Sequence, residues 1–204
     1  MKTVAALGGK GGSGKSTTVV NLACEDVRAG RSVTIIDLDP QSTSAKWSDR
    51  RGNFTPLVVS GQAQRLDRLM EQAESDILYI DTQGRSTGDA VTVGKRADLI
   101  LLPCRPTLAD IETLTDMVDL LRTANAVEKA HVFWNGCLSA ADPRIKAGTM
   151  MVEDMGLTVC PIVWCQRVPY GDALVTGQSV SEMDPSSKAS KEVAALHAWV
   201  MERV

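Results

Sequence analysis

The sequence predicts a single α/β domain with a mostly parallel, twisted sheet and helices on both faces. Short runs that are apolar throughout alternate with segments of helical spacing, as expected for strands buried on both faces. The 204 residues suit one domain, placed over residues 1–204, and 44% of them are hydrophobic. The net charge of −3 supplies no overall basic field that would attract nucleic acid.

Apolar runs and helical periodicity define the expected elements in the first part of the chain. Each expected strand is a short apolar run bounded by polar or glycine residues: 3–7, 32–36, 57–59 and 77–80. Each expected helix shows helical spacing or polar, helix-compatible composition: 16–29, 43–51 and 62–73. Gly30 is expected to end the first of these helices.

The same signals continue in the second part of the chain. Strands are expected at residues 99–102, 132–134 and 159–163, and helices at 108–124, 146–155 and 185–204. Polar or glycine clusters follow the strands near residues 8, 37, 81 and 135. Because ligands of open α/β sheets bind beyond the carboxyl ends of the strands, we expect the functional residues at one edge.

Cysteine and hydropathy patterns bear on the compartment. The five cysteines form no C-x-x-C pair, and only two histidines are present, which favours reduced thiols over a disulfide framework or a metal knuckle. No apolar stretch approaches about 18 residues, the length of a membrane span. No signal peptide precedes the first expected strand. These features predict a cytoplasmic protein.

Residues 8–17 read Gly-Gly-Lys-Gly-Gly-Ser-Gly-Lys-Ser-Thr, directly behind the first strand. Within them, Gly9, Gly14, Lys15 and Ser16 fit the spacing G-x-x-x-x-G-K-[ST], which predicts a P-loop NTPase. Glycines let backbone N–H groups approach phosphate oxygens, and the next helix adds its positive end. The residues expected to bind the nucleotide are Gly11, Gly12, Ser13, Gly14, Lys15, Ser16 and Thr17.

Three aspartates at expected strand ends complete the predicted hydrolytic site. Asp81 ends an apolar run, which is typical of a Walker B-type carboxylate that holds Mg²⁺, although Asp-Thr-Gln-Gly is also a fair turn sequence. Asp37 and Asp39 face the same way on an extended segment, so one can orient the attacking water while the other supports Mg²⁺. An N-cap and turn cluster is the alternative for this pair. Gly84 is placed to bring a backbone N–H to the γ-phosphate.

Lys10 is a second lysine in the same loop. Its charge repels that of Lys15 unless extra negative charge is present, and a triphosphate supplies that charge. The Lys10 side chain can fold back on its own site or reach across a dimer to the partner's phosphates. The simpler alternative is a solvated lysine at an unconstrained position.

Several segments resemble one family. Residues 10–17 resemble the deviant Walker A motif of the ParA/MinD ATPases. Residues 37–41, Asp-Leu-Asp-Pro-Gln, resemble the D-x-D-P-Q segment of the ParA branch, and residues 81–84 are similar to the family's Walker B end. Residues 166–170 and 177–180 resemble the nucleotide-side loop and the G-x-S-V turn of small ParA proteins. One departure is the glutamine after Asp-Thr, where the family often has proline or alanine.

The resemblance implies a mechanism and partners. With no helix-turn-helix segment before the first strand, the chain is most like the short ParA/ParF-like plasmid partition ATPases. The resemblance implies ATP and Mg²⁺ as cofactors, with the metal at Ser16, Asp39 and Asp81. It implies catalytic roles for Lys10 and Lys15, with Asp39 positioning the hydrolytic water and Asp37 beside it. Lys10 would cross to the other subunit's phosphates in an ATP-bridged homodimer.

The same resemblance implies a cellular role. It implies weak intrinsic ATPase activity that a ParB-like centromere-binding protein stimulates, and non-specific DNA binding by the ATP dimer, which would associate with the nucleoid. The candidate local basic pairs, either for DNA contact or as ordinary solvated faces, are Arg50-Arg51, Lys95-Arg96, Arg144 with Lys146, and Lys188 with Lys191. On the base side, Asn135 is an adenine contact or a turn residue. Gln166 and Arg167 are nucleotide contacts or ordinary loop residues.

Three other functions compete with DNA partition. A MinD-like membrane or protein-positioning ATPase would need a basic, amphipathic C-terminal helix, whereas residues 192–204 are expected to pack on the sheet, without stable membrane association. An iron–sulfur carrier would need cysteines that bridge a cluster between subunits, and the surroundings of Cys104 and Cys137 repeat no such motif. A dethiobiotin synthetase-like ligase conflicts with the Asp-Pro-Gln segment.

Overall fold

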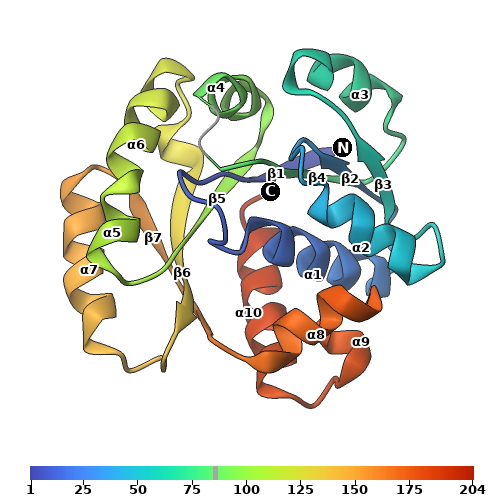
Figure 1. The fold of residues 1–204 in the computed structure, drawn as a ribbon. Helices are drawn as coiled ribbons and strands as arrows, with labels where there is room; N and C mark the ends of the chain where they lie inside the picture. The colour runs from blue at the N-terminus through green and yellow to red at the C-terminus, as the bar shows by residue number, and fades with distance from the viewer. Residues whose placement is uncertain (85–86) are drawn as a thin grey trace.

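The computed structural model describes residues 1–84 and 87–204, which form a seven-stranded sheet in the order β3-β2-β4-β1-β5-β6-β7 (Figure 1). All neighbouring strands pair in parallel. The strands are β1 (Lys2–Ala6), β2 (Val33–Asp37), β3 (Leu57–Ser60), β4 (Ile77–Asp81), β5 (Leu99–Cys104), β6 (Ala130–Cys137) and β7 (Thr158–Cys165). The predicted α/β class and all seven predicted strands are confirmed.

Helices cover both faces of the sheet because the strands are apolar on both sides. In β4, Leu78 and Ile80 pack into one apolar layer, whereas Ile77 and Tyr79 pack into the other. The helices of the first layer are α3 (Leu66–Gln72), α4 (Thr87–Arg96), α5 (Leu108–Ile111), α6 (Thr113–Thr123) and α7 (Pro143–Asp154). Those of the second are α1 (Lys15–Arg28), α2 (Thr43–Arg51), α8 (Val168–Thr176), α9 (Val180–Met183) and α10 (Lys188–Met201) (Figure 1).

Two predicted helices are divided in the structure. The helix expected over 62–73 begins as a 3₁₀ turn, Ala63–Arg65, before α3. The helix expected over 108–124 is interrupted at Glu112, between α5 and α6. There the Thr113 hydroxyl donates to the Asp110 carbonyl oxygen at 2.7 Å. Such a side-chain bond competes with the helical ladder and explains the break.

Three helices were not predicted. Helix α4 carries Gly88 and Gly94, which weaken a helical signal. Helices α8 and α9 occupy the segments interpreted as a loop and a turn. Their starts follow known capping rules, because Pro169 lies in the first turn of α8 and Ser179 and Glu182 form a capping box on α9. Helix α10 begins at Lys188 rather than at 185. No described helix is long and apolar enough to cross a lipid bilayer.

Candidate functional site

The central strands bring the predicted residues to one edge of the sheet. Asp81 at the end of β4 lies in register with Ala6 on β1 and with Asp37 on β2. The P-loop, residues 8–17, leaves β1 at this edge and enters α1, whose first residue is Lys15. Asp81 and Asp39 are close enough to Lys15 to act electrostatically on its ammonium group. The structure therefore assembles the P-loop and the aspartates predicted from sequence.

Lys15 is a buried cation at the start of α1. Its Nζ donates to the Lys10 carbonyl oxygen at 3.1 Å, and only 6% of the residue is exposed. Burial lowers the pKa of Lys15, while the charges of Asp81 and Asp39 oppose that shift. Gly14, the N-cap residue of α1, has φ 99° and leaves the first helical N–H groups without a side-chain cap. Uncapped N–H groups beside a desolvated ammonium favour a bound anion.

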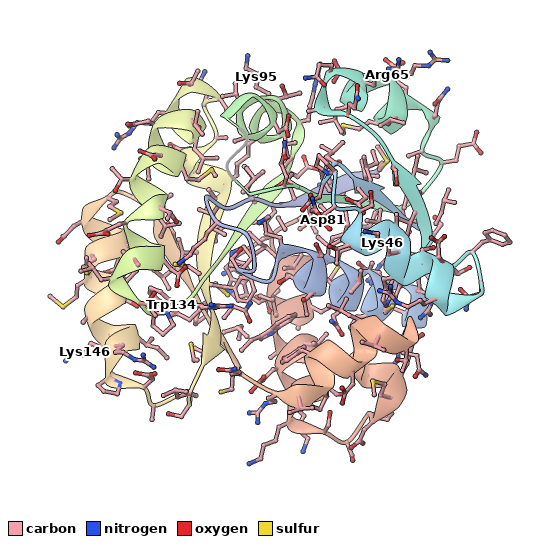
Figure 2. All side chains as sticks on the ribbon, viewed as in Figure 1. Lys46, Arg65, Asp81, Lys95, Trp134 and Lys146 are labelled. Atoms are coloured by element: carbon pink, nitrogen blue, oxygen red, sulfur yellow. The ribbon has the colours of Figure 1, made fainter. Side chains whose placement is uncertain are left out.

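Asp81 is fully buried at the end of β4, at the centre of the molecule in Figure 2. The Ser44 hydroxyl donates to its Oδ2 at 2.7 Å, while Oδ1 has no hydrogen-bond partner among the described residues. Burial raises the pKa of Asp81 to about 6, against the lowering effects of Ser44, Ser16 and Lys15. An unpartnered carboxylate oxygen near the Ser16 hydroxyl is chemically suited to Mg²⁺.

Asp37 accepts backbone hydrogen bonds through both of its carboxylate oxygens. Its Oδ1 accepts the Asp39 N–H at 3.0 Å, and its Oδ2 accepts the Ala45 N–H at 2.9 Å. Burial raises the pKa of Asp37, and these backbone bonds partly offset the shift. The structure thus shows the cap-and-turn contacts of Asp37, and its predicted place beside the hydrolytic water stays a prediction.

Asp39 is the more accessible of the two aspartates. Its Oδ1 accepts the Gln41 N–H at 2.8 Å, and Oδ2 makes no hydrogen bond within the described part of the chain. Asp39 lines a cavity of about 480 Å³ together with Gln83 and Asp89. It therefore has an oxygen available to a water molecule in this cavity.

Lys10 forms an ion pair within its own chain. Its Nζ forms a 2.9 Å ion pair with Oδ1 of Asp110 on α5, and the Thr107 hydroxyl donates to Oδ2 of Asp110 at 2.6 Å. Burial raises the pKa of Asp110, but the Thr107 and Lys10 hydrogen bonds and the Lys10 charge hold it below its usual value. The Lys10 side chain is therefore held by Asp110, a residue that the sequence did not single out, and is not simply a free solvated lysine.

The loop after β4 contacts the P-loop backbone directly. A Cβ added to Gly84 would lie 2.8 Å from both Gly11 N and Lys10 C, so a side chain here would displace the P-loop. Gln83 points toward α4, where its Nε2 donates to Asp89 Oδ2 at 3.0 Å. The loop after β4 and the P-loop are therefore in direct backbone contact.

A second cavity lies on the other side of the P-loop. It encloses about 340 Å³, and its lining includes Gly12, Arg105, Asn135, Arg144 and Gln166. Asn135 lies within β6, not in a turn after the strand as expected, and its Nδ2 donates to the Ser13 carbonyl oxygen at 2.7 Å. Gln166 is held at the cavity by its N–H, which donates to the Cys137 carbonyl oxygen at 2.8 Å.

Arg167 does not line this cavity. Its guanidinium bonds Oε1 of Glu192 on α10 through Nε at 3.0 Å and Nη2 at 2.6 Å. Oε2 of Glu192 accepts hydrogen bonds from the Tyr170 hydroxyl and the Cys165 N–H. Arg167 thus fastens the start of α8 to α10, and a nucleotide contact by Arg167 stays a prediction.

Comparisons with known proteins agree with this geometry. Residues 4–158 match the family described as the CobQ/CobB/MinD/ParA nucleotide binding domain. The chain belongs to this family. A carboxysome distribution protein A of Gloeobacter kilaueensis is 32% identical over 120 residues, covering 57% of this chain and 55% of that protein. Protein ParA of Rhizobium radiobacter is 29% identical over 114 residues, covering 54% and 51%.

The family fold extends over nearly the whole chain. The ATP complex of a Cyanothece McdA variant has a TM-score of 0.73 at 19% identity, covering 96% of this chain and 95% of that one. By sequence, the match spans only about half the length of the two curated relatives. The shared fold therefore includes α8 to α10, beyond the residues that match the family by sequence.

Four residues of this CobQ/CobB/MinD/ParA-family chain contact the predicted site residues but were not predicted from the sequence: Ser44, Arg105, Asp110 and Glu192. Arg105 had a usable signal, because it directly follows an apolar strand, like the residues chosen at the other strand ends. Ser44, Asp110 and Glu192 had no such signal. Each lies on a helix and reaches the site through tertiary packing.

The basic pairs of this family member lie on different elements. Lys46, Lys95 and Lys146 mark well-separated parts of the surface (Figure 2). Arg51 is not a surface cation, since its side chain is 8% exposed and paired with Glu182. Arg96 pairs with Asp67 at 2.7 Å, and Arg144 pairs with Asp142 at 2.5 Å. In three of the predicted pairs, one arginine is therefore bound by a carboxylate of the same chain.

The cysteines near the site are buried thiols. Burial raises the pKa of both Cys104 and Cys137 to about 12, so both are protonated at neutral pH. In residues 1–84 and 87–204, no group of three or more His, Cys, Asp or Glu side chains is arranged to hold a metal ion. A Mg²⁺ ion bound with nucleotide needs no such group, because phosphates and water supply most of its ligands.

Proposed function

We propose that the protein is a ParA/MinD-type ATPase that binds ATP with Mg²⁺ and hydrolyses it slowly. The observation that carries the proposal is the combination of buried Lys15, the unpartnered Oδ1 of Asp81 and the accessible Asp39 at one edge of the sheet. Family membership supports a nucleotide ligand. The ATP bound to the related McdA of Cyanothece supports adenosine triphosphate.

Each residue has a defined task in this proposal. Lys15 and the N–H groups at the start of α1 bind the β- and γ-phosphate oxygens, and Thr17 binds the next phosphate inward. Ser16 and Asp81 hold Mg²⁺, with Asp39 in support; the ion neutralises charge on the phosphates when bound. Asp39 orients the attacking water and accepts its proton. The backbone N–H of Gly84 contacts the γ-phosphate, and this contact links the phosphate to the loop after β4, which lies beside the P-loop.

Turnover with and without Mg²⁺ tests this reaction. Purified protein should bind ATP and ADP and release phosphate slowly when Mg²⁺ is present. Asp39→Ala should lower the hydrolysis rate by at least about 100-fold, the usual contribution of a general base, while ADP affinity changes less than about twofold. Asp49→Ala, an exposed aspartate on α2, is the matched control. Unchanged turnover in Asp39→Ala would move the water-orienting role elsewhere.

We further propose that ATP drives formation of a homodimer in which Lys10 crosses to the partner subunit's phosphates. The Lys10 side chain is 41% exposed and held by one ion pair, so it can be released. Lys10→Ala should leave ATP binding by the monomer largely intact and abolish the ATP-dependent dimer in light scattering. A variant that still dimerises normally would remove Lys10 from the interface.

The cellular role that we propose is plasmid partition: an ATP dimer binds DNA without sequence preference, and a ParB-like partner stimulates hydrolysis. ParA of Rhizobium radiobacter supports this role, whereas the carboxysome protein of Gloeobacter kilaueensis favours the alternative of positioning a protein assembly. Both roles are compatible with the same dimer. Because several of the predicted basic residues are ion-paired within the chain, binding by a dimer, which doubles the remaining cations, is favoured over binding by one subunit.

DNA and vesicle binding, measured side by side, discriminate the remaining possibilities. DNA binding should require ATP. The logarithm of the DNA-binding constant should fall linearly with the logarithm of the salt concentration, with a slope of roughly 0.9 per phosphate contact. Anionic vesicles should not co-sediment the protein with or without ATP. Vesicle binding in the presence of ATP would favour the MinD-like alternative. The absence of both, with normal ATPase activity, would favour a protein cargo.

A further inference from the structure

Two side chains hold consecutive carbonyl groups of the P-loop from outside. Arg105, directly after β5, donates from Nη2 to the Gly12 carbonyl oxygen at 2.8 Å. Asn135, on β6, donates from Nδ2 to the Ser13 carbonyl oxygen at 2.7 Å. Both side chains line the 340 Å³ cavity beside the P-loop. The P-loop is thus fastened to two neighbouring strands at two successive peptide groups.

These bonds fix the direction of the backbone donors. In a trans peptide the carbonyl oxygen and the following N–H point in opposite directions. Holding the Gly12 and Ser13 carbonyls toward Arg105 and Asn135 therefore turns the N–H groups of Ser13 and Gly14 the other way, to the opposite side of the loop. Backbone N–H groups turned to one side in this manner form an anion-binding concavity.

The contact with Asn135 leaves little freedom. A Cβ on Gly14 would lie 2.1 Å from Asn135 Nδ2, so the amide sits directly against the glycine backbone. Gly14 has φ 99°, a left-handed conformation that a side chain would also strain. The amide and the glycine therefore define one close approach between β6 and the P-loop.

We infer that Arg105 and Asn135 are positioning residues that hold the P-loop in its phosphate-binding conformation. The inference rests on the proposed nucleotide function and assigns the two residues to the phosphates, not to the base. If one of the two bonds is removed, the loop should spend part of its time in conformations that do not bind phosphate. The apparent phosphate affinity should then fall in proportion to the population of the binding-competent conformation.

Arg144 provides a charge-matched comparison. It lines the same cavity as Arg105, but its guanidinium is bound by Asp142 rather than by the P-loop. If Arg105 acted only as a positive charge near the phosphates, removing either arginine would have a similar effect. If Arg105 acts through the Gly12 carbonyl, its removal is the more damaging change.

The experiment compares Arg105→Met, Asn135→Ala and Arg144→Met with the wild-type chain. Affinities for ADP and for pyrophosphate are measured by competition with a fluorescent ADP analogue, because pyrophosphate reaches the P-loop without a base. We expect Arg105→Met to weaken ADP and pyrophosphate by a similar factor of about tenfold, the usual effect of one hydrogen bond. Asn135→Ala should do the same, and Arg144→Met should lose clearly less.

Three results would overturn the inference. One is an Arg105→Met chain with wild-type affinity for pyrophosphate. Another is a loss confined to ADP, which would make Arg105 a wall of the base pocket. The third is an equal loss in Arg144→Met, which would reduce the effect to charge. Thermal unfolding followed by circular dichroism verifies that each variant folds. A wild-type chain that binds neither ligand would contradict the proposed function itself.

Discussion

The burial of Asp81 opposes folding at neutral pH. Its carboxylate is fully buried, and one oxygen has no donor among the described residues. Burial raises its pKa to about 6 from an ordinary value of 3.8, so ionisation costs free energy in the folded chain. A carboxylate kept under this penalty is in a favourable position to bind a cation, because binding removes the penalty.

Asp81→Asn should therefore make the metal-free protein more stable above pH 6. Because the folded-state pKa is the higher one, the penalty is absent below about pH 4, where both states are protonated, and develops as pH rises through 6. We compare the free energy of unfolding of the variant with that of the wild-type chain at each pH. This difference should shift by about 2 kcal/mol in favour of the variant between pH 4 and pH 8. Urea unfolding at the two pH values measures this, and a pH-independent difference would contradict it.

Helix α2 joins the loop after β2, residues 38–42, to the C-terminal helices. Its start is bonded by Asp37 through the Ala45 N–H, and its other end is fastened to α9. The Trp47 indole N–H donates to the Gln178 carbonyl oxygen at 3.0 Å, and Arg51 pairs with Glu182. A displacement of the loop after β2 must therefore involve α9 as well as α2.

Breaking the Arg51–Glu182 pair should be costly. Arg51 would be left as a buried cation, and Glu182 also bonds the Ser179 N–H in the capping box. Glu182→Ala should lower the free energy of unfolding by about 3 kcal/mol, as for other buried pairs that lose one partner. Glu202→Ala removes an exposed partner of Arg203 and should cost less than about 0.5 kcal/mol. Equal losses in urea unfolding would show that the pair is not structural.

At the scale of the whole molecule, Lys10 must leave its ion pair with Asp110 before it can reach the partner's phosphates in the proposed ATP-bridged dimer. In the structure Lys10 is bound to Asp110 of its own chain, and Asp110 is itself fixed by Thr107. The ion pair therefore competes with the proposed contact across the dimer. If the proposed dimer forms, its stability depends on the strength of this pair.

Asp110→Asn should favour dimerisation. Losing a half-exposed ion pair of about 1 kcal/mol would lower the ATP concentration needed for half-maximal dimer by about fivefold. Light scattering across an ATP titration measures the shift, and Asp116→Asn on α6 serves as the exposed control. A shift to higher ATP concentrations would instead show that Asp110 orients Lys10 for its crossing.

The sequence was informative where chemistry and local structure coincide. The P-loop and Asp81 could be located because glycine spacing and strand ends leave direct traces in the chain. The roles of Asp37, Asn135 and Arg167 could not, since each depends on a backbone group or a glutamate that is distant in sequence or hidden in a turn. Helices α8 and α9 were missed because their loop-like composition concealed good capping signals.

The apolar layer formed by α1 and α10 determines how the chain can be divided. The sequence match to the family ends at residue 158, yet Val193, Leu196 and Val200 of α10 cover the same side of the sheet as α1. A fragment truncated at residue 158 would expose that layer, including Trp47, to water. We expect it to aggregate on expression although it retains every predicted phosphate-binding residue of the P-loop. The region that matches the family by sequence is therefore smaller than the unit that folds.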